Sequence, residues 1–197
     1  MKVGLFFGSF NPIHMGHLMI ARYWLNETEL EEIWLIVSPH NPHKPAEALA
    51  PVEHRLEMAR LSVAGDETLK VSEVELQLSR PSYTIHTLEH LRQCYSSVEW
   101  VLLLGADAAA GLPTWKEGHR LLNEWTIWVY PRQGAALENV PDAPLLRKFP
   151  EAPRIDLTAT QIRTYVSTGK SIRYLVPPSV ERYIYEKGLY ASSASSS

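Results

Sequence analysis

The sequence predicts an α/β protein built on a doubly wound parallel sheet. Short, continuous apolar runs alternate along the chain with stretches of helical periodicity, an order typical of parallel strands joined by crossover helices. The runs also lack the alternation of apolar and polar residues that marks a half-exposed antiparallel sheet. They therefore indicate strands that are buried on both faces.

The first half of the chain predicts three strands and three helices. An apolar run over residues 3–7 predicts the first strand, and the spacing of Leu18, Ala21 and Leu25 gives the next segment one apolar helical face. A second continuous run over 33–37 predicts another buried strand. The remaining elements expected here are helices over 52–64 and 84–94 and a strand of mixed exposure over 69–76.

The second half predicts the strand with the strongest core character, over residues 100–104, then a short helix over 114–122 and a buried strand over 126–130. Residues 133–153 are rich in proline and alanine, and we expect them to form a flexible surface insertion. In open parallel sheets, ligands bind beyond the carboxyl ends of the strands. We therefore expect the loops over 8–17, 38–45 and 105–107 to line one crevice.

Size, charge and cysteine content restrict the class of protein. The 197 residues suit a single domain, which we place at 1–190, with a serine-rich flexible tail at 191–197. A net charge of −3 argues against a nucleic-acid partner, and no apolar segment approaches the roughly 20 residues needed to span a membrane. The single cysteine and the lack of a signal-peptide pattern predict a cytoplasmic protein. The sequence leaves open whether the protein forms a homo-oligomer.

The most informative segment runs from Gly8 to His17 and joins the first strand to the first helix. A glycine-bearing turn at a helix N-terminus is an anion site, because free backbone N–H groups converge there and the helix dipole favours negative charge. His14 and His17 in the same turn indicate chemistry on a phosphate. The segment has neither the lysine of a Walker loop nor three glycines at dinucleotide-binding offsets. Two solvated histidines or a zinc pair remain the alternatives.

A second anion site is expected near residues 156–163. Asp156 or Thr158 can cap a helix there, and Thr160 and Arg163 lie three residues apart on one helical face. Arginine is the side chain best matched to bidentate contacts with phosphate. On its own, this pattern is also compatible with a capped surface helix.

The His-x-Gly-His sequence at 14–17 resembles the signature of the nucleotidyltransferase superfamily, and residues 158–163 resemble its Ser-Ser-Thr-x-x-Arg signature, with Thr158 and Ala159 in place of the two serines. Further matches cover 39–44, 82–88, 105–107 with Leu112 and Trp115, and 169–177. Together they resemble the bacterial nicotinate mononucleotide adenylyltransferases, from Val3 to about Tyr190. The resemblance implies a Rossmann-like nucleotidyltransferase fold. One departure is His86, which stands where the family usually has aspartate.

The resemblance also implies a reaction and a set of site residues. ATP and nicotinate mononucleotide (NaMN) would react by direct in-line attack, without a covalent intermediate, giving deamido-NAD and pyrophosphate. Mg²⁺ would arrive with ATP and not in a protein cage. His17, His14 and Arg163 would be the catalytic contacts to the phosphates. The other ATP-binding residues implied are Gly8, Ser9, Phe10, Gly16, Lys44 and Thr160. The NaMN-binding residues implied are Tyr83, Thr84, Asp107 and Trp115.

Three alternatives stay open at this point. Asp107 would contact a ribose, although a helix N-cap is nearly as good an interpretation. Another adenylyltransferase of the superfamily, acting on phosphopantetheine or on nicotinamide mononucleotide (NMN), would share both signatures. A non-catalytic nucleotide-binding module on the same fold is the third alternative.

Overall fold

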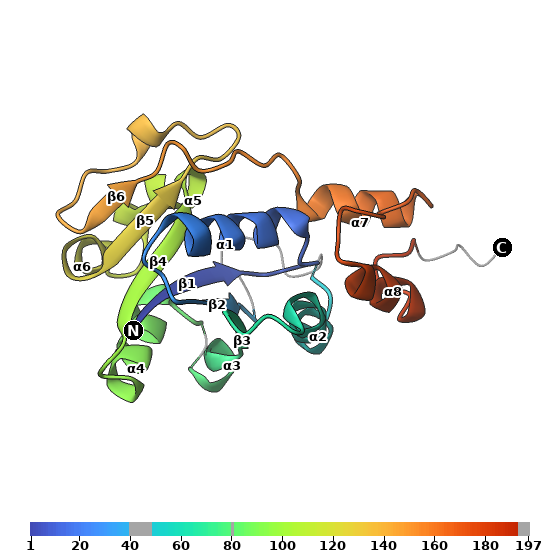
Figure 1. The fold of residues 1–197 in the computed structure, drawn as a ribbon, viewed down its shortest axis with the longest axis horizontal. Coiled ribbons are helices and arrows are strands. Elements are labelled where there is room, and N and C mark those ends of the chain that lie inside the picture. The colour runs from blue at the N-terminus through green and yellow to red at the C-terminus, as the bar shows by residue number, and fades with distance from the viewer. Residues whose placement is uncertain (40–48, 80, 193–197) are drawn as a thin grey trace.

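The computed structural model describes residues 1–39, 49–79 and 81–192. Lys44 and residues 193–197 of the predicted tail lie outside the described residues. Six strands form one parallel sheet in the order β3-β2-β1-β4-β5-β6 (Figure 1). They are β1 (Lys2–Gly8), β2 (Glu32–Val37), β3 (Leu69–Ser72), β4 (Glu99–Gly105), β5 (Thr126–Tyr130) and β6 (Leu146–Lys148).

The strand order confirms the predicted doubly wound sheet. From β1 the chain adds β2 and β3 on one side, and from β4 it adds β5 and β6 on the other. The winding therefore reverses between β1 and β4, whose residues pair in parallel from Lys2 and Glu99 onward. In open α/β sheets a ligand binds outside the carboxyl ends of the strands at such a reversal.

Helices cover both faces of the sheet. On one face, a hydrophobic cluster packs the sheet against α1 (Met15–Glu27), α2 (Val52–Val63), α7 (Ala159–Ser167) and α8 (Pro178–Glu186). On the opposite face, a second cluster packs it against α4 (Thr84–Cys94), α5 (Ala106–Ala110) and α6 (Gly118–Glu124). Leu5 and Phe6 are neighbours in β1 but belong to different clusters. This explains why the strand sequences are apolar at consecutive positions.

The apolar face of α1 is shifted from the predicted one. Ile20, Ala21 and Trp24 are buried, whereas Leu18 and Leu25 are partly buried and pack at the edge of the same cluster. No helix within the described part of the chain is long and apolar enough to cross a membrane.

The expected strand over 69–76 is wrong in its second half. β3 ends at Ser72, whose hydroxyl accepts a hydrogen bond from the backbone N–H of Val74 at 3.3 Å, and the chain then forms the short helix α3 (Val74–Gln77). Val74 and Glu75 are consecutive residues and both are buried. In a strand of mixed exposure, one of two consecutive side chains would point to the exposed face. The expected helix over 114–122 is also divided, into the 3₁₀ turn η2 (Leu112–Thr114) and α6.

The prediction of a flexible insertion over 133–153 is wrong. This segment contains the 3₁₀ turn η3 (Leu137–Asn139) and the edge strand β6, which pairs with β5. Val140, Phe149 and Ala152 are buried in the two clusters. The segment is therefore an integral part of the sheet and of its core.

Candidate active site

The loop after β1 brings two imidazole rings together at the start of α1. His14 is the N-cap of the helix, and its ring stacks on that of His17 with centroids 3.7 Å apart. The backbone N–H of His14 donates to Nδ1 of His17 at 3.2 Å. Because Nδ1 accepts this bond, a neutral His17 carries its proton on Nε2. His17 can then offer an Nε2–H donor to an oxyanion.

The two histidines have different environments. His14 is 3% exposed, and burial, with the nearby charge of Arg132, lowers its pKa to about 4. Its ring is therefore neutral at physiological pH. Nδ1 of His14 is buried and has no hydrogen-bond partner among the described residues. His17 is half-exposed, with its ring against the edges of Phe6 and Phe10. It is the more accessible of the two rings.

The glycines of this loop make room for its own side chains. A Cβ on Gly16 would lie 3.0 Å from Nδ1 of His14 and from Ile155, and a Cβ on Gly8 would lie 2.9 Å from the ring of Phe10. Phe10 is 1% exposed and has a positive φ of 43°. Its side chain is therefore part of the core. Only its backbone is left for the predicted contact with ATP.

The second predicted anion site lies directly beside the first. Thr158 is the N-cap of α7 and accepts from the backbone N–H of Gln161 at 3.1 Å, which decides between the two predicted caps. Arg163 Nη1 donates to the backbone oxygen of Asn11 at 2.8 Å, and Nη2 donates to Oγ1 of Thr160 at 3.2 Å. Arg163 thus joins α7 to the histidine-bearing loop, which is 152 residues earlier in the chain.

A cavity of about 420 Å³ opens beside this loop at the carboxyl ends of β1 and β4. Five predicted site residues line it: Gly8, Ser9, Tyr83, Thr84 and Trp115. Tyr83 is the N-cap of α4, so the first N–H groups of this helix lie at the wall. Those of His86 and Thr87 donate to the backbone oxygen of Tyr83. The cavity therefore combines an indole ring with an anion-favouring helix start.

Glu75, which is not among the predicted site residues, also lines the cavity. Glu75 is 3% exposed and accepts hydrogen bonds from the hydroxyls of Thr87, at 3.1 Å, Ser38 and Ser82. Burial raises the pKa of its carboxyl group. Glu75 thereby ties the end of β2 and the segment before α4 to α4 itself. A glutamate between apolar neighbours in the expected strand was the available signal.

Arg132 is also absent from the predicted site residues. It follows β5, and its Nε lies 3.9 Å from Oδ1 of Asp107. A Cβ on Gly105 would lie 2.6 Å from atoms of both side chains, so this glycine allows them to approach across the end of β4. Gly105 is the N-cap of α5, and Asp107 is in the first turn. The alternative role of Asp107 as a helix N-cap is therefore wrong. A basic residue two positions after a buried parallel strand was the signal for Arg132.

The sequence matches the family model described as cytidylyltransferase-like over residues 5–168. Several curated relatives carry the name "Probable nicotinate-nucleotide adenylyltransferase", and two of them illustrate the similarity. The protein of Bacteroides fragilis is 40% identical over 94% of this chain and 92% of its own length. That of Flavobacterium johnsoniae is 38% identical over 96% of this chain and 99% of its own length.

Solved structures resemble the fold over nearly the whole chain. A Plasmodium falciparum nicotinic acid mononucleotide adenylyltransferase complexed with NaAD has a TM-score of 0.77 at 18% identity, covering 96% of this chain and 97% of that one. The same enzyme complexed with APC has a TM-score of 0.76, covering 96% of each chain. These likenesses confirm the predicted Rossmann-like nucleotidyltransferase fold.

Proposed function

The chain belongs to the cytidylyltransferase-like family, and its curated relatives are named nicotinate-nucleotide adenylyltransferase. We propose that it transfers the adenylyl group of ATP to NaMN. The products are deamido-NAD and pyrophosphate, which places the reaction in NAD biosynthesis. The hydrogen bond from Arg163 to Asn11, at 2.8 Å, carries the proposal. It ties an arginine to the loop that carries the two histidines, and this loop borders a cavity that can hold an aromatic ring.

The reaction needs little covalent help from the protein. A phosphate oxygen of NaMN attacks the α-phosphorus of ATP, and the bond from this phosphorus to the bridging oxygen breaks, so that pyrophosphate leaves with the electron pair. NaMN already carries its nucleophile, and catalysis can therefore rest on positioning and on stabilising charge. The Nε2–H of His17 and the neutral ring of His14 face the transferring group in this proposal. Ser9 and the backbone at Gly8, Phe10 and Gly16 complete the cradle.

The leaving phosphates require positive charge. Arg163 and Thr160 are proposed to hold the β- and γ-phosphates, with Lys44 as a further cation. No three His, Cys, Asp or Glu side chains gather into a metal site among the described residues. The cations and hydroxyls of the crevice suit phosphate oxygens, and phosphate oxygens with water are the ligands that Mg²⁺ prefers. Mg²⁺ bound to ATP would neutralise developing charge on the phosphates.

The mononucleotide is proposed to bind in the cavity beside the phosphates. Trp115 would stack on the pyridine ring, and the N–H groups at Tyr83 and Thr84 would take the nicotinate carboxylate. Asp107 would contact a ribose. Incubation with ATP, Mg²⁺ and a panel of mononucleotides, with pyrophosphate as the readout, tests the proposal. Binding of ATP without pyrophosphate release from any member of the panel would favour the non-catalytic nucleotide-binding module instead.

The pyridine substituent should decide between the two pyridine mononucleotides. We expect kcat/KM for NaMN to exceed that for NMN at least about tenfold, because charge-assisted hydrogen bonds are stronger than neutral ones and the amide of NMN leaves one donor unpaired. Steady-state kinetics with both substrates measures the ratio. Equal use of NMN would contradict recognition of the carboxylate by the start of α4.

Arg163→Lys should raise the KM for ATP about tenfold or more, although the charge is kept. The arginine uses one terminal nitrogen for Asn11 and the other for Thr160, and a lysine ammonium cannot reproduce this planar fork. Arg22→Lys is the matched control, because Arg22 pairs with Asp66 on the protein surface. An unchanged KM in Arg163→Lys would exclude the proposed contact with the phosphates.

A further inference from the structure

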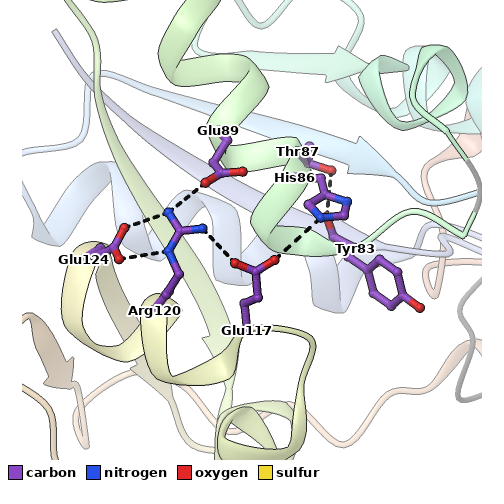
Figure 2. A network of polar contacts seen from close by, with 7 residues as sticks. All are labelled: Tyr83, His86, Thr87, Glu89, Glu117, Arg120 and Glu124. Atoms are coloured by element: carbon purple, nitrogen blue, oxygen red, sulfur yellow. Dashed lines mark hydrogen bonds and ion pairs between the residues drawn. The ribbon is translucent and has the colours of Figure 1, made fainter.

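Arg120 forms the centre of a polar network that no step of the proposed reaction uses (Figure 2). Its guanidinium donates to both carboxylate oxygens of Glu124, at 2.9 and 3.0 Å, to Glu117 at 2.7 Å and to Glu89 at 2.7 Å. Glu124 lies in α6 like Arg120 itself, whereas Glu89 lies in α4 and Glu117 precedes α6. Two of the three contacts therefore reach beyond helix α6.

The contact with Glu117 fixes the turn that carries Trp115. Glu117 has a left-handed backbone, with φ 53° and ψ 34°, which a residue other than glycine keeps only where its surroundings hold it. A Cβ on Gly118 would lie 2.0 Å from the backbone oxygen of Leu112, so the chain folds closely back on itself here. Trp115 lies inside this tight turn, between Leu112 and Gly118.

The contact with Glu89 reaches the helix that forms another part of the cavity wall. Glu89 belongs to α4, whose first turn carries Tyr83 and Thr84. His86, from the same turn, directs Nε2 toward the second oxygen of Glu117 at 3.8 Å, and its ring meets the edge of Tyr83 (Figure 2). His86 therefore faces a carboxylate and adds to the link between α4 and the Trp115 turn. Tyr83, Thr84 and Trp115 line one cavity.

We propose that Arg120 is a positioning residue for the pyridine-binding cavity. It holds the Trp115 turn at a fixed distance from the start of α4. The proposal rests on the proposed function, in which these two walls bind the nicotinate ring. Arg120 does not line the cavity, and it acts only through Glu117 and Glu89.

The geometry distinguishes this network from an ordinary surface ion pair. Isolated exposed ion pairs contribute little to stability. Their Coulomb attraction is weak in the high dielectric of water, and ordering two long side chains costs entropy. Here one guanidinium makes four hydrogen bonds and joins three carboxylates into one network, two of which lie outside α6. The carboxylates, Glu124 foremost, raise the pKa of Arg120, and Arg120 lowers the pKa of Glu117. Both groups therefore stay charged throughout the range in which the enzyme would work.

Arg120→Gln should raise the KM for NaMN about five- to tenfold, with the KM for ATP within about twofold of the parent. A misplaced Trp115 weakens the contacts with the pyridine ring and leaves the phosphate cradle of His14, His17 and Arg163 intact. Glu89→Gln should show a smaller shift in the same direction, because it removes only the bond to α4. Glu124→Gln is the control, since its bonds to Arg120 stay within α6. Its KM values should match those of the parent.

Each outcome separates the inference from the function on which it rests. A parent protein that releases no pyrophosphate with NaMN would contradict both. An active parent with an unchanged NaMN KM in Arg120→Gln would overturn the inference alone. So would equal rises in both KM values with a lowered melting temperature, because that result indicates a purely structural role. If Arg120→Gln does not fold, the contrast between Glu89→Gln and Glu124→Gln carries the same test.

Discussion

His17→Ala is expected to lower kcat by about two to three orders of magnitude, with a much smaller change in the KM for ATP. Removing one preorganised donor from a site that stabilises transition-state charge typically has an effect of this size. Two contacts hold the ring of His17, which carries the Nε2–H donor. The backbone N–H of His14 donates to Nδ1 of His17, and the ring of His14 stacks on that of His17 with centroids 3.7 Å apart. An interaction formed mainly in the transition state alters kcat, whereas uniform binding alters KM.

Pyrophosphate release at saturating ATP and NaMN measures this effect. His119→Ala is the matched control, because His119 is an exposed histidine on α6, away from the phosphate loop. His119→Ala should retain the parental rate. Turnover of His17→Ala within a few-fold of the parent would refute the proposed role in stabilising charge. A large rise in the KM for ATP at constant kcat would instead assign His17 to ground-state binding.

The parts of the fold that the sequence predicts well are those specified by local pattern. The range of α4 and that of β5 agree with the structure at both ends. The α4 segment has a helical apolar periodicity and the β5 segment is a continuous apolar run, and each has a clear boundary. β6 escaped prediction because Leu146, Arg147 and Lys148 form no apolar run. β6 forms because it pairs with β5, and the two strands are too far apart in the sequence for a short sequence window to contain both.

The same distinction applies to the candidate site. His14, His17 and Arg163 are found from the sequence because their spacing within each segment carries the signal. The structure adds that the two segments meet, through the bond from Arg163 to Asn11. Arg132 and Glu75 depend on which strand ends and helix starts adjoin, and no local pattern contains that information.

Arg55 is the largest departure from the periodicity of its own helix. The sequence predicts a helix over 52–64 with an apolar face, and nothing in this pattern marks an arginine as buried. Yet Arg55 is 1% exposed. Its guanidinium donates to the backbone oxygens of Ala50 at 3.0 Å, Ser9 and Ser38 at 2.7 Å each, and Pro39 at 2.8 Å. Arg55 thus joins the loops after β1 and β2 beneath the candidate site.

Arg55→Met should lower the free energy of unfolding by at least about 3 kcal/mol. Methionine keeps much of the apolar volume but leaves four partly buried backbone carbonyls without their donor, and an unsatisfied group that water does not reach costs about 1–3 kcal/mol. Urea unfolding followed by circular dichroism measures the loss as a lower midpoint with an unchanged slope.

Arg60→Met is the matched control for this prediction. It makes the same substitution on the same helix, at an exposed arginine paired with Glu73. Exposed substitutions of this kind usually change stability by less than about 0.5 kcal/mol. A loss of the same small size in Arg55→Met would show that the loops after β1 and β2 keep their conformation without the guanidinium. A large loss in Arg55→Met alone would establish that a single buried cation holds the two loops together.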